Sequence, residues 1–184
     1  MGKTALVVVD MQNDFVNEDG ALPVPGAKSI IPAVNSLIYR FKTRDLPVFF
    51  TYDCHDLNSS EFKKFGKHCI IGSHGSKIHN GIDLPQGRYL IPKSTFSAFD
   101  DQTLKLLLKI LKVDTIVVCG VATEYCVAET AIDAAKNGFI TAVATDAVKA
   151  ISTAAEDEAI TKMTEAGITG LTSDEVERKL LRND

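Results

Sequence analysis

Six short runs of apolar residues, each followed by a segment of a different character, are the feature of this sequence that most constrains its fold. The runs are nearly unbroken in their hydrophobicity, which is typical of strands that are covered on both faces of a sheet. They lie at residues 4–9, 47–52, 88–92, 115–119, 139–145 and 168–172. Because helical patterns separate most of them, the strands are expected to be parallel. The sequence therefore predicts a three-layer α/β/α sandwich with a six-stranded, mostly parallel sheet.

The segments between the strands indicate where the helices lie. Residues 29–44 carry apolar side chains at helical spacing. Further helices are expected at 100–112, from Thr123 to about 138, at about 153–166 and from Ser173. Residues 54–87 are long and irregular, and they contain all four histidines. With 184 residues and no internal repeat or linker, we expect one domain over residues 1–184, with this loop as an insertion.

Composition and charge exclude several classes of function. A net charge of -4 argues against nucleic acid as a partner, because no basic patch is available to meet phosphates. No apolar run approaches the roughly 18 residues of a membrane span, and the N-terminus does not resemble a signal peptide. The four cysteines form no CxxC pair and no secreted disulfide framework. We therefore expect free thiols in a reducing cytoplasm and no membrane partner.

Polar residues follow several of the predicted strands. Asp10, Asp53, Lys93 and Asp146 each end a strand or follow it directly, and Cys126 lies just after another. Ligands of parallel α/β folds bind at the carboxyl ends of the strands, so these side chains should share one edge. Asp146 is the exception, since we interpret it as a cap for a neighbouring helix. Among the others, Asp10, Lys93 and Cys126 supply an acid–base group, a cation and a nucleophile.

Cys126 lies in a strand–turn–helix segment. Gly120 ends the strand, and Thr123 is expected to cap the helix that follows. Cys126 then occupies about the third helical position, where free backbone N–H groups favour an anion and should lower the pKa of the thiol. This arrangement favours a sulfur nucleophile. The alternative is a small buried cysteine that packs the helix against the sheet.

Other active-site motifs of α/β proteins are missing. No GxGxxG or Walker lysine loop follows a strand, so nucleotide binding has no support. The GxSxG turn of serine hydrolases is also absent. A cysteine hydrolase remains.

Three segments carry a resemblance to a known family. VVVDMQNDF (7–15), KSTFSAF (93–99) and CGVATEYCV (119–127) resemble the isochorismatase-like cysteine hydrolases, and among these most of all the nicotinamidases. The resemblance extends from the first strand to about Asp146. It implies a catalytic triad of Asp10, Lys93 and Cys126. It also implies a cis peptide bond at Val121–Ala122, with the amides of Ala122 and Cys126 forming an oxyanion hole.

The histidine-rich loop resembles the metal-binding loop of the nicotinamidases. Asp53, His55 and His68 match its DxH…H pattern, and Glu61 stands where the family has a further ligand. The resemblance therefore implies one divalent metal ion and no nucleotide cofactor. Zinc is the first expectation, and the extra carboxylate leaves manganese and iron as alternatives. Without the resemblance, a solvated turn that binds no metal would be the favoured interpretation of these residues.

Three phenylalanines are candidates for substrate binding. Phe15, Phe65 and Phe96 occupy positions at which the family lines a pocket for a flat ring, although ordinary core packing is the alternative for each. Nicotinamidases commonly carry tryptophan at the position of Phe65, and the segment after Lys93 is short here. These departures leave room for another amide substrate.

Three functions remain at this point. The first is hydrolysis of nicotinamide to nicotinate and ammonia through a cysteine thioester, as part of NAD salvage. The second is hydrolysis of a ureido or N-carbamoyl substrate, although such relatives tend to lack the DxH loop. The third is a non-catalytic metal- or redox-responsive module, which the presence of Asp10 and Lys93 makes unnecessary. Members of the family commonly form dimers or tetramers, so the resemblance allows a homo-oligomer.

Overall fold

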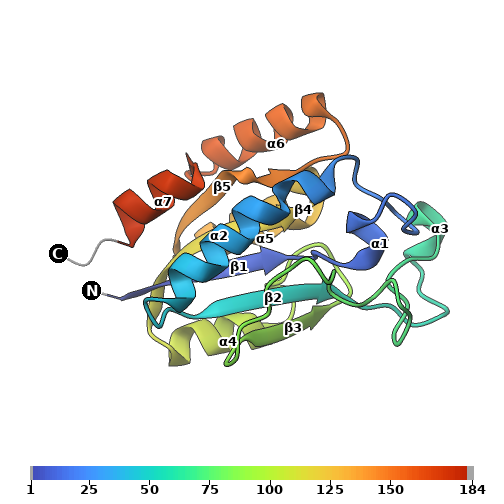
Figure 1. Cartoon of the computed structure of the whole chain (residues 1–184), viewed down its shortest axis with the longest axis horizontal. Coiled ribbons are helices and arrows are strands. Elements are labelled where there is room, and N and C mark those ends of the chain that lie inside the picture. Colours follow the sequence, from blue (N-terminus) through green and yellow to red (C-terminus); the bar gives the residue numbers. More distant parts are fainter. Residues whose placement is uncertain (1, 182–184) are drawn as a thin grey trace.

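The computed structural model describes residues 2–181, which form a six-stranded sheet with helices on both faces (Figure 1). Neighbouring strands are parallel throughout, in the order β3-β2-β1-β4-β5-β6. The strands are β1 (Lys3–Val9), β2 (Val48–Asp53), β3 (Tyr89–Lys93), β4 (Val113–Val121), β5 (Ile140–Lys149) and β6 (Thr169–Leu171). The predicted α/β/α fold is therefore confirmed.

The central strand β1 shows why the apolar runs are unbroken. Successive side chains of a strand point to opposite faces, and both faces of this sheet are covered. Leu6 and Val8 belong to one buried cluster, whereas Ala5, Val7 and Val9 belong to the other. All five residues are 0% exposed. A polar residue at any of these positions would have no solvent to face.

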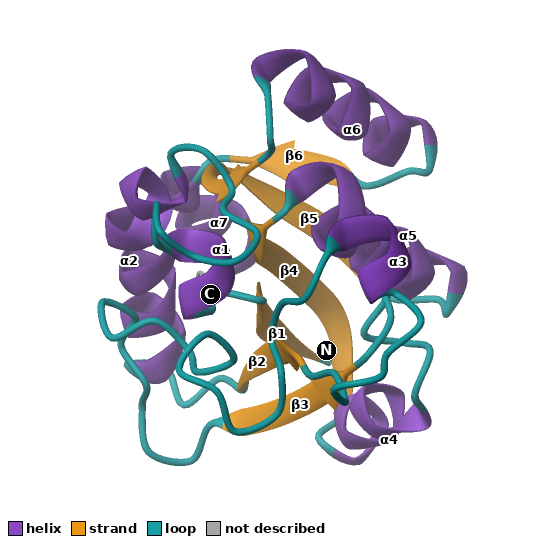
Figure 2. Cartoon of the chain, turned by 90° about the vertical axis from the view of Figure 1, so that its right-hand side faces the viewer, coloured by secondary structure: helices purple, strands orange, loops and turns teal. Residues whose placement is uncertain are grey.

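The helices divide between the two faces (Figure 2). The side chains of α2 and α7 join the cluster of Leu6, and those of α4, α5 and α6 join or adjoin the cluster of Val7. The helices are α1 (Asn13–Val16), η1 (Ala27–Ile30), α2 (Ile31–Lys42), α3 (Phe62–Phe65), α4 (Gln102–Ile110), η2 (Thr123–Val127), α5 (Ala128–Lys136), α6 (Thr153–Glu165) and α7 (Ser173–Leu180). The α-helical turns α1 and α3 were not predicted, since four residues are too few to show a period.

The predicted segment 29–44 begins earlier and ends earlier than expected. A 3₁₀ turn, η1, comes first, and α2 follows with Pro32 near its first position, where proline is tolerated. The predicted helix at 100–112 is shorter than expected, since α4 spans Gln102–Ile110. Its first turn is capped by Asp101, whose carboxylate accepts a hydrogen bond from the backbone N–H of Thr103 at 2.7 Å.

Asp146 lies inside a strand and does not end one. The sequence predicts a strand that stops there, but β5 continues to Lys149. Asp146 Oδ1 accepts hydrogen bonds from the backbone N–H and the hydroxyl of Ser173, at 2.8 and 2.9 Å. Asp146 therefore ties β5 to the first residue of α7, in agreement with a structural role.

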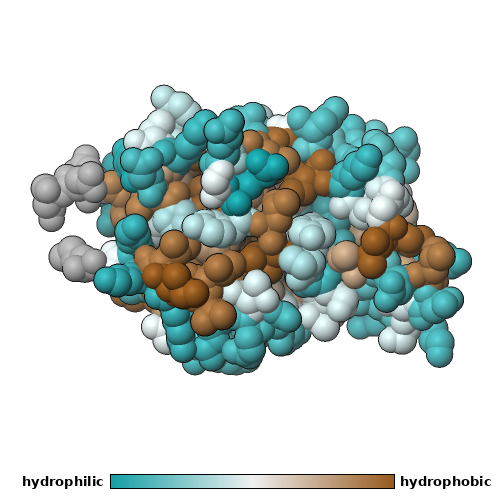
Figure 3. Space-filling model, turned by 90° about the horizontal axis from the view of Figure 1, so that it is seen from below, coloured by the Kyte–Doolittle hydropathy of each residue, from teal (hydrophilic) through white to brown (hydrophobic). Residues whose placement is uncertain are grey.

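The side of the molecule that carries β3 and α4 exposes several large apolar side chains. Figure 3 shows brown side chains gathered on this side, which is viewed from below. Leu90, Leu106 and Ile110 are 46%, 58% and 65% exposed. Gathered apolar side chains of this kind mark contact surfaces more often than scattered ones do. Within residues 2–181 there is no helix with the length and hydrophobicity needed to span a bilayer.

Candidate active site

The carboxyl ends of β1, β2, β3 and β4 meet at one edge of the sheet, at the right of Figure 1. Asp10 follows β1 directly and is 0% exposed. Its backbone has a φ of 49°, so the chain leaves the direction of the strand at this residue. Thr51, in the adjacent strand, donates a hydrogen bond from its hydroxyl to Asp10 Oδ1 at 2.6 Å. The other carboxylate oxygen of Asp10 remains available for a different partner.

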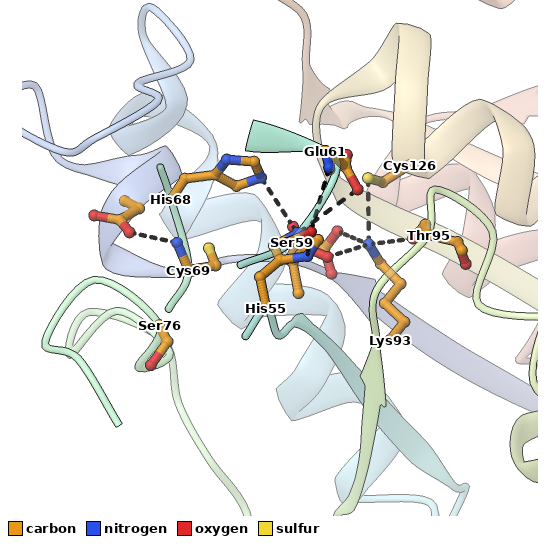
Figure 4. A network of polar contacts seen from close by, with 12 residues as sticks. His55, Ser59, Glu61, His68, Cys69, Ser76, Lys93, Thr95 and Cys126 are labelled. Carbon is orange, nitrogen blue, oxygen red and sulfur yellow. Dashed lines mark hydrogen bonds and ion pairs between the residues drawn. The ribbon is translucent and has the colours of Figure 1, made fainter. Parts of the chain in front are cut away.

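That partner is Lys93, at the end of the edge strand β3. Its Nζ lies 2.6 Å from Asp10 Oδ2, and it donates hydrogen bonds to Cys126 Sγ at 3.3 Å and to the carbonyl oxygen of Thr95 at 3.0 Å (Figure 4). The same nitrogen lies 3.6 Å from Asp53 Oδ1. A buried ammonium needs such partners, because its desolvation is costly. Lys93 therefore brings Asp10 and Cys126 to one point.

Cys126 lies in the π-helical turn η2, which joins β4 to α5. The peptide bond between Val121 and Ala122 is cis, as the resemblance implies. The expected N-cap at Thr123 is wrong. Ala122 occupies the position before the turn, and the buried hydroxyl of Thr123 has no hydrogen-bond partner among residues 2–181. The turn presents Cys126 toward Lys93 with 8% of the residue exposed.

The expected lowering of the Cys126 pKa is also wrong. Burial raises the pKa of the thiol well above its ordinary value, and the positive charge of Lys93 offsets this only in part because Asp10 and Asp53 raise it further. Burial likewise raises the pKa of Asp10, although Lys93 opposes this. Burial would lower the pKa of Lys93, but the attraction of Asp10 and its other neighbours raises it overall. The resting site thus combines a thiol, an ammonium group and an unusually basic carboxylate.

Three predicted metal ligands lie together beside this group. Ligand atoms of Asp53, His55 and His68 all lie within 4.8 Å of one another, and all three residues are buried. Asp53 Oδ2 is 2.8 Å from His55 Nε2 and 3.3 Å from His68 Nε2. Burial would raise the pKa of Asp53, but the hydrogen bond from His68 and the charge of Lys93 lower it overall. The carboxylate is therefore ionised, as a metal ligand must be.

The outer nitrogens of the two imidazoles are held by other groups. His68 Nδ1 donates a hydrogen bond to the carbonyl oxygen of Gly66 at 2.9 Å, so in the neutral imidazole Nε2 would be the atom that can bind a metal ion. His55 Nδ1 lies 3.4 Å from the hydroxyl of Ser59. Two imidazoles and a carboxylate in this geometry fit a divalent transition metal. Glu61 Oε2 lies 3.8 Å from His55 Nε2, at the rim of this cluster and outside its tight set of three.

The remaining histidines of the loop lie elsewhere. His74 is a neighbour of Asn13, whose side-chain amide donates to its carbonyl oxygen at 2.9 Å. The ring of His79 accepts a hydrogen bond from the backbone N–H of Gly81 at 3.0 Å. Both lie in the long loop, outside the cluster of Asp53, His55 and His68.

An apolar cavity of about 180 Å³ lies between Cys126 and the metal-ligand cluster. Its lining includes the predicted Phe15, Phe65 and Phe96, together with Tyr125, whose role was not predicted. The ring centroids of Phe96 and Tyr125 are 5.4 Å apart, and those of Phe65 and Tyr125 are 5.8 Å apart. Further lining residues are Asp10, Leu22, Pro23, Val24, Asp53, Glu61, His68, Val121, Ala122, Cys126 and Ile151. The cavity has the size and the aromatic walls that a flat ring requires.

Comparisons with known proteins agree with this geometry. Residues 4–175 match the family model described as the isochorismatase domain. A nicotinamidase of Acinetobacter baylyi is 36% identical over an alignment that covers 80% of this chain and 81% of that protein. The crystal structure of a pyrazinamidase of Pyrococcus horikoshii in complex with zinc superposes with a TM-score of 0.87 at 38% identity, covering 92% of this chain and 99% of that one. An N-carbamoylsarcosine amidase from Thermoplasma acidophilum superposes with a TM-score of 0.86 at 33% identity, covering 95% and 99%.

Proposed function

The chain belongs to the isochorismatase family, and on this premise we propose that it hydrolyses nicotinamide to nicotinate and ammonia, a step of NAD salvage. The observation that carries the proposal is that Lys93 contacts both Asp10 and Cys126, and that these two line an aromatic cavity together with the metal-ligand candidates Asp53 and His68. A cavity with a nucleophile on one side and metal ligands on the other suits an aromatic ring that bears a carboxamide. The similarity to a nicotinamidase and to a pyrazinamidase supports the same substrate class.

The proposed reaction begins with proton transfer from Cys126 to Asp10. Because burial raises the pKa of the Cys126 thiol well above its ordinary value, the proton rests on sulfur before this transfer. The ammonium group of Lys93 stabilises the Cys126 thiolate that forms. This thiolate then attacks the carboxamide carbon. The protonated Asp10 then gives its proton to the departing ammonia. Water hydrolyses the resulting thioester: Asp10 accepts a proton from the attacking water and returns it to the departing Cys126 sulfur, and nicotinate leaves.

The oxyanion that forms during attack needs hydrogen-bond donors. We propose that the backbone N–H groups of Ala122 and Cys126 supply them. The turn between β4 and α5 places both residues on the wall of the cavity. Fixed backbone donors in a site that excludes water are effective in this role.

We propose that Asp53, His55, His68 and Glu61 hold one divalent metal ion, with zinc as the first candidate and manganese or iron as alternatives. When bound, the ion would offer the ring nitrogen of the substrate an electrophilic partner and so hold the ring in place. The aromatic residues Phe15, Phe65 and Phe96 would pack against the faces and the edge of the ring. The similarity to a pyrazinamidase in complex with zinc supports this assignment.

Removing the metal is therefore expected to impair substrate binding more than chemistry. Dialysis against a chelator should lower kcat/KM for nicotinamide by about 10-fold or more, mainly through a higher KM. Added zinc should restore the lost activity. Ammonia release measured across a range of nicotinamide concentrations gives the two parameters, and unchanged kinetics in the metal-free protein would contradict the proposal.

A second prediction concerns Thr51, which orients the carboxylate of Asp10. Thr51→Val keeps the shape of the side chain but removes the hydroxyl that donates to Asp10 at 2.6 Å. We expect kcat to fall by about 10-fold, with KM nearly unchanged, because a misaligned base affects the proton transfers and not substrate binding. Thr141→Val is a matched control, since Thr141 is also a buried strand threonine, but in the described part of the chain its hydroxyl bonds only to the carbonyl oxygen of Phe139. An equal loss in both variants would contradict this role.

The similarity to an N-carbamoylsarcosine amidase keeps a second function open, namely hydrolysis of a ureido or N-carbamoyl compound. Ammonia release from nicotinamide and from N-carbamoylsarcosine, measured in parallel with zinc present, distinguishes the two. The proposal expects nicotinamide to be the better substrate by at least about 100-fold in kcat/KM. A preference for N-carbamoylsarcosine would replace the proposed function with the second one.

The setting of the enzyme is part of the proposal. We propose a single domain that acts in the cytoplasm on a small amide, without a nucleic acid or membrane partner. The free thiols of Cys54, Cys69, Cys119 and Cys126 support a reducing compartment. If the protein is a homo-oligomer, the exposed apolar side chains of β3 and α4 are the surface that subunit contacts would bury.

A further inference from the structure

A short segment after β1 bonds to the backbone around all three clustered metal ligands. This segment consists of Gln12, Asn13 and Asp14, which belong to the sequence VVVDMQNDF but have no part in the proposed chemistry. Gln12 is 0% exposed although its side chain is a polar amide. Such a group is costly to bury unless each of its polar atoms is paired. The partners of Gln12 therefore indicate what it is for.

All polar atoms of the Gln12 side chain contact the backbone beside the site. Its Oε1 accepts a hydrogen bond from the backbone N–H of Asp53 at 2.6 Å. Its Nε2 donates to the carbonyl oxygens of Asp53 and Ser76, both at 2.8 Å. The amide of Gln12 thus pairs with both backbone groups of Asp53, as a neighbouring strand would. The side chain of Gln12 thereby supplies the hydrogen bonds that the backbone of β1 would have made to Asp53, because the chain has left the strand direction at Asp10.

Asp14 makes equivalent contacts on the other side of the cluster. Its Oδ2 accepts a hydrogen bond from the backbone N–H of Cys69 at 2.7 Å, and its Oδ1 accepts one from that of Ala21 at 3.2 Å. The carbonyl oxygen of Cys69 in turn accepts a hydrogen bond from the backbone N–H of His55 at 3.1 Å. Because Cys69 directly follows His68, fixing its backbone restrains both imidazoles.

The loop is built to let Asp14 approach closely. Gly75 packs against the carboxylate of Asp14, and a Cβ at Gly75 would lie 2.1 Å from its oxygens. The backbone N–H of Asp14 also donates to the carbonyl oxygen of Gly75 at 3.0 Å. The contact therefore requires glycine at position 75. This close packing holds the segment and the loop in one arrangement.

We propose that Gln12 and Asp14 are positioning residues for the metal ion: Gln12 fixes Asp53, and Asp14 fixes the backbone that carries His55 and His68. The inference rests on the proposed metal site. It goes beyond that site because it makes the affinity for the metal ion depend on residues that do not contact the coordinating side-chain atoms. Figure 4 shows two of these partners, Cys69 and Ser76, beside the network of Asp53's neighbours. Removing hydrogen-bonded groups behind metal ligands typically weakens binding by about 10- to 100-fold.

The test is the zinc affinity of variants, measured by competition with a chromophoric chelator on protein first stripped of metal. Gln12→Met has nearly the same shape but none of the three hydrogen bonds, and Asp14→Asn exchanges one acceptor oxygen for a donor. We expect each to raise the Kd for zinc by about 10- to 100-fold. Excess zinc should recover activity toward nicotinamide in both variants, which damage to the catalytic groups would not allow.

Asn35 offers a matched control in helix α2. Its side-chain amide also bridges two backbone groups of the long loop, donating to the carbonyl oxygen of Gly81 at 2.8 Å and accepting from the backbone N–H of Asp83 at 3.0 Å. Neither contact involves a metal-ligand candidate or a residue adjacent to one. Asn35→Leu should therefore leave the Kd for zinc within about threefold of the wild type, and thermal unfolding in excess chelator shows whether each variant is folded.

The outcomes separate this inference from the function on which it rests. Wild-type zinc affinity in Gln12→Met or in a folded Asp14→Asn would overturn it, as would an equal loss in Asn35→Leu. If Gln12→Met does not fold, Asp14→Asn alone decides. A wild-type protein that binds zinc but does not hydrolyse nicotinamide would overturn the proposed function and leave the inference to be judged by affinity. A wild type that binds none of zinc, manganese and iron would overturn the proposed metal site and this inference with it, whereas the ammonia assay alone decides the proposed hydrolysis.

Discussion

Replacing Cys126 with alanine is expected to reduce ammonia release from nicotinamide to the background rate, a loss of at least about 10⁴-fold in kcat. In the proposed reaction the sulfur forms the covalent bond to the acyl carbon, and within residues 2–181 Lys93 Nζ has no other thiol and no hydroxyl among its hydrogen-bond partners. The variant should still bind zinc and nicotinamide, because the metal ligands and the aromatic wall are unchanged. A continuous ammonia assay with zinc present measures the loss.

Cys119 provides the control for this substitution. It lies in β4, seven residues before Cys126, and its side chain joins the opposite core cluster. Cys119→Ala should keep kcat within a few-fold of the wild type, with a modest loss of stability from the small cavity. A Cys126→Ala protein that is folded and retains more than about a tenth of the wild-type kcat would mean that another group attacks the substrate.

Replacing Lys93 with methionine is expected to damage both activity and stability. Methionine has a similar length but leaves the carboxylates of Asp10 and Asp53 without the ammonium that lies 2.6 and 3.6 Å from them. Removing one partner of a buried ion pair typically costs about 3–5 kcal/mol in the free energy of unfolding. Loss of the cation beside the thiolate should lower kcat by about 10²–10³-fold. Urea unfolding and the ammonia assay measure the two effects separately.

The same substitution at an exposed lysine is a control that measures the effect of losing one positive charge. Lys109 lies on the outer face of α4, so Lys109→Met should change the free energy of unfolding by less than about 0.5 kcal/mol and leave kcat unaffected. If Lys93→Met were as stable and as active as Lys109→Met, Lys93 would not be the centre of the site.

The sheet could be predicted from the sequence because its strands are buried on both faces. Ala5 to Val9 contain no polar residue that would obscure the run, and the helices between the strands require parallel pairing. The same reasoning brings Asp10, Lys93 and Cys126 to one edge, because each follows or ends a strand. A functional side chain at the carboxyl end of a parallel strand can therefore be predicted from the sequence pattern alone.

Other parts of the site could not be predicted, since they depend on contacts across long separations in the chain. Thr51 lies within an apolar strand, and only the structure shows that its hydroxyl faces Asp10, 41 residues earlier. Gln12 and Asp14 act through the backbone of Asp53 and Cys69, which no side-chain pattern encodes. Tyr125 could have been found, because it adjoins Cys126 in a turn that faces the cavity.

The pKa of Cys126 could not be predicted from the sequence for a different reason. A cysteine in the first turn of a helix favours a thiolate, and this led to the expectation of a lowered pKa. The structure shows that the thiol is buried among Lys93, Asp10 and Asp53, so desolvation and two carboxylates outweigh one ammonium group. How deeply a residue is buried depends on the packing of the whole domain, so it cannot be predicted from a local sequence motif.

The most direct test of the proposed chemistry is mass spectrometry of the zinc-loaded protein after rapid acid quenching of its first turnover of nicotinamide. A cysteine mechanism predicts a nicotinoyl group on the peptide that contains Cys126, which forms before nicotinate appears and is absent from Cys126→Ala. Release of ammonia and nicotinate at the same rate, with the Cys126 peptide unmodified at every quench time, would contradict it and would indicate direct attack of water on the amide.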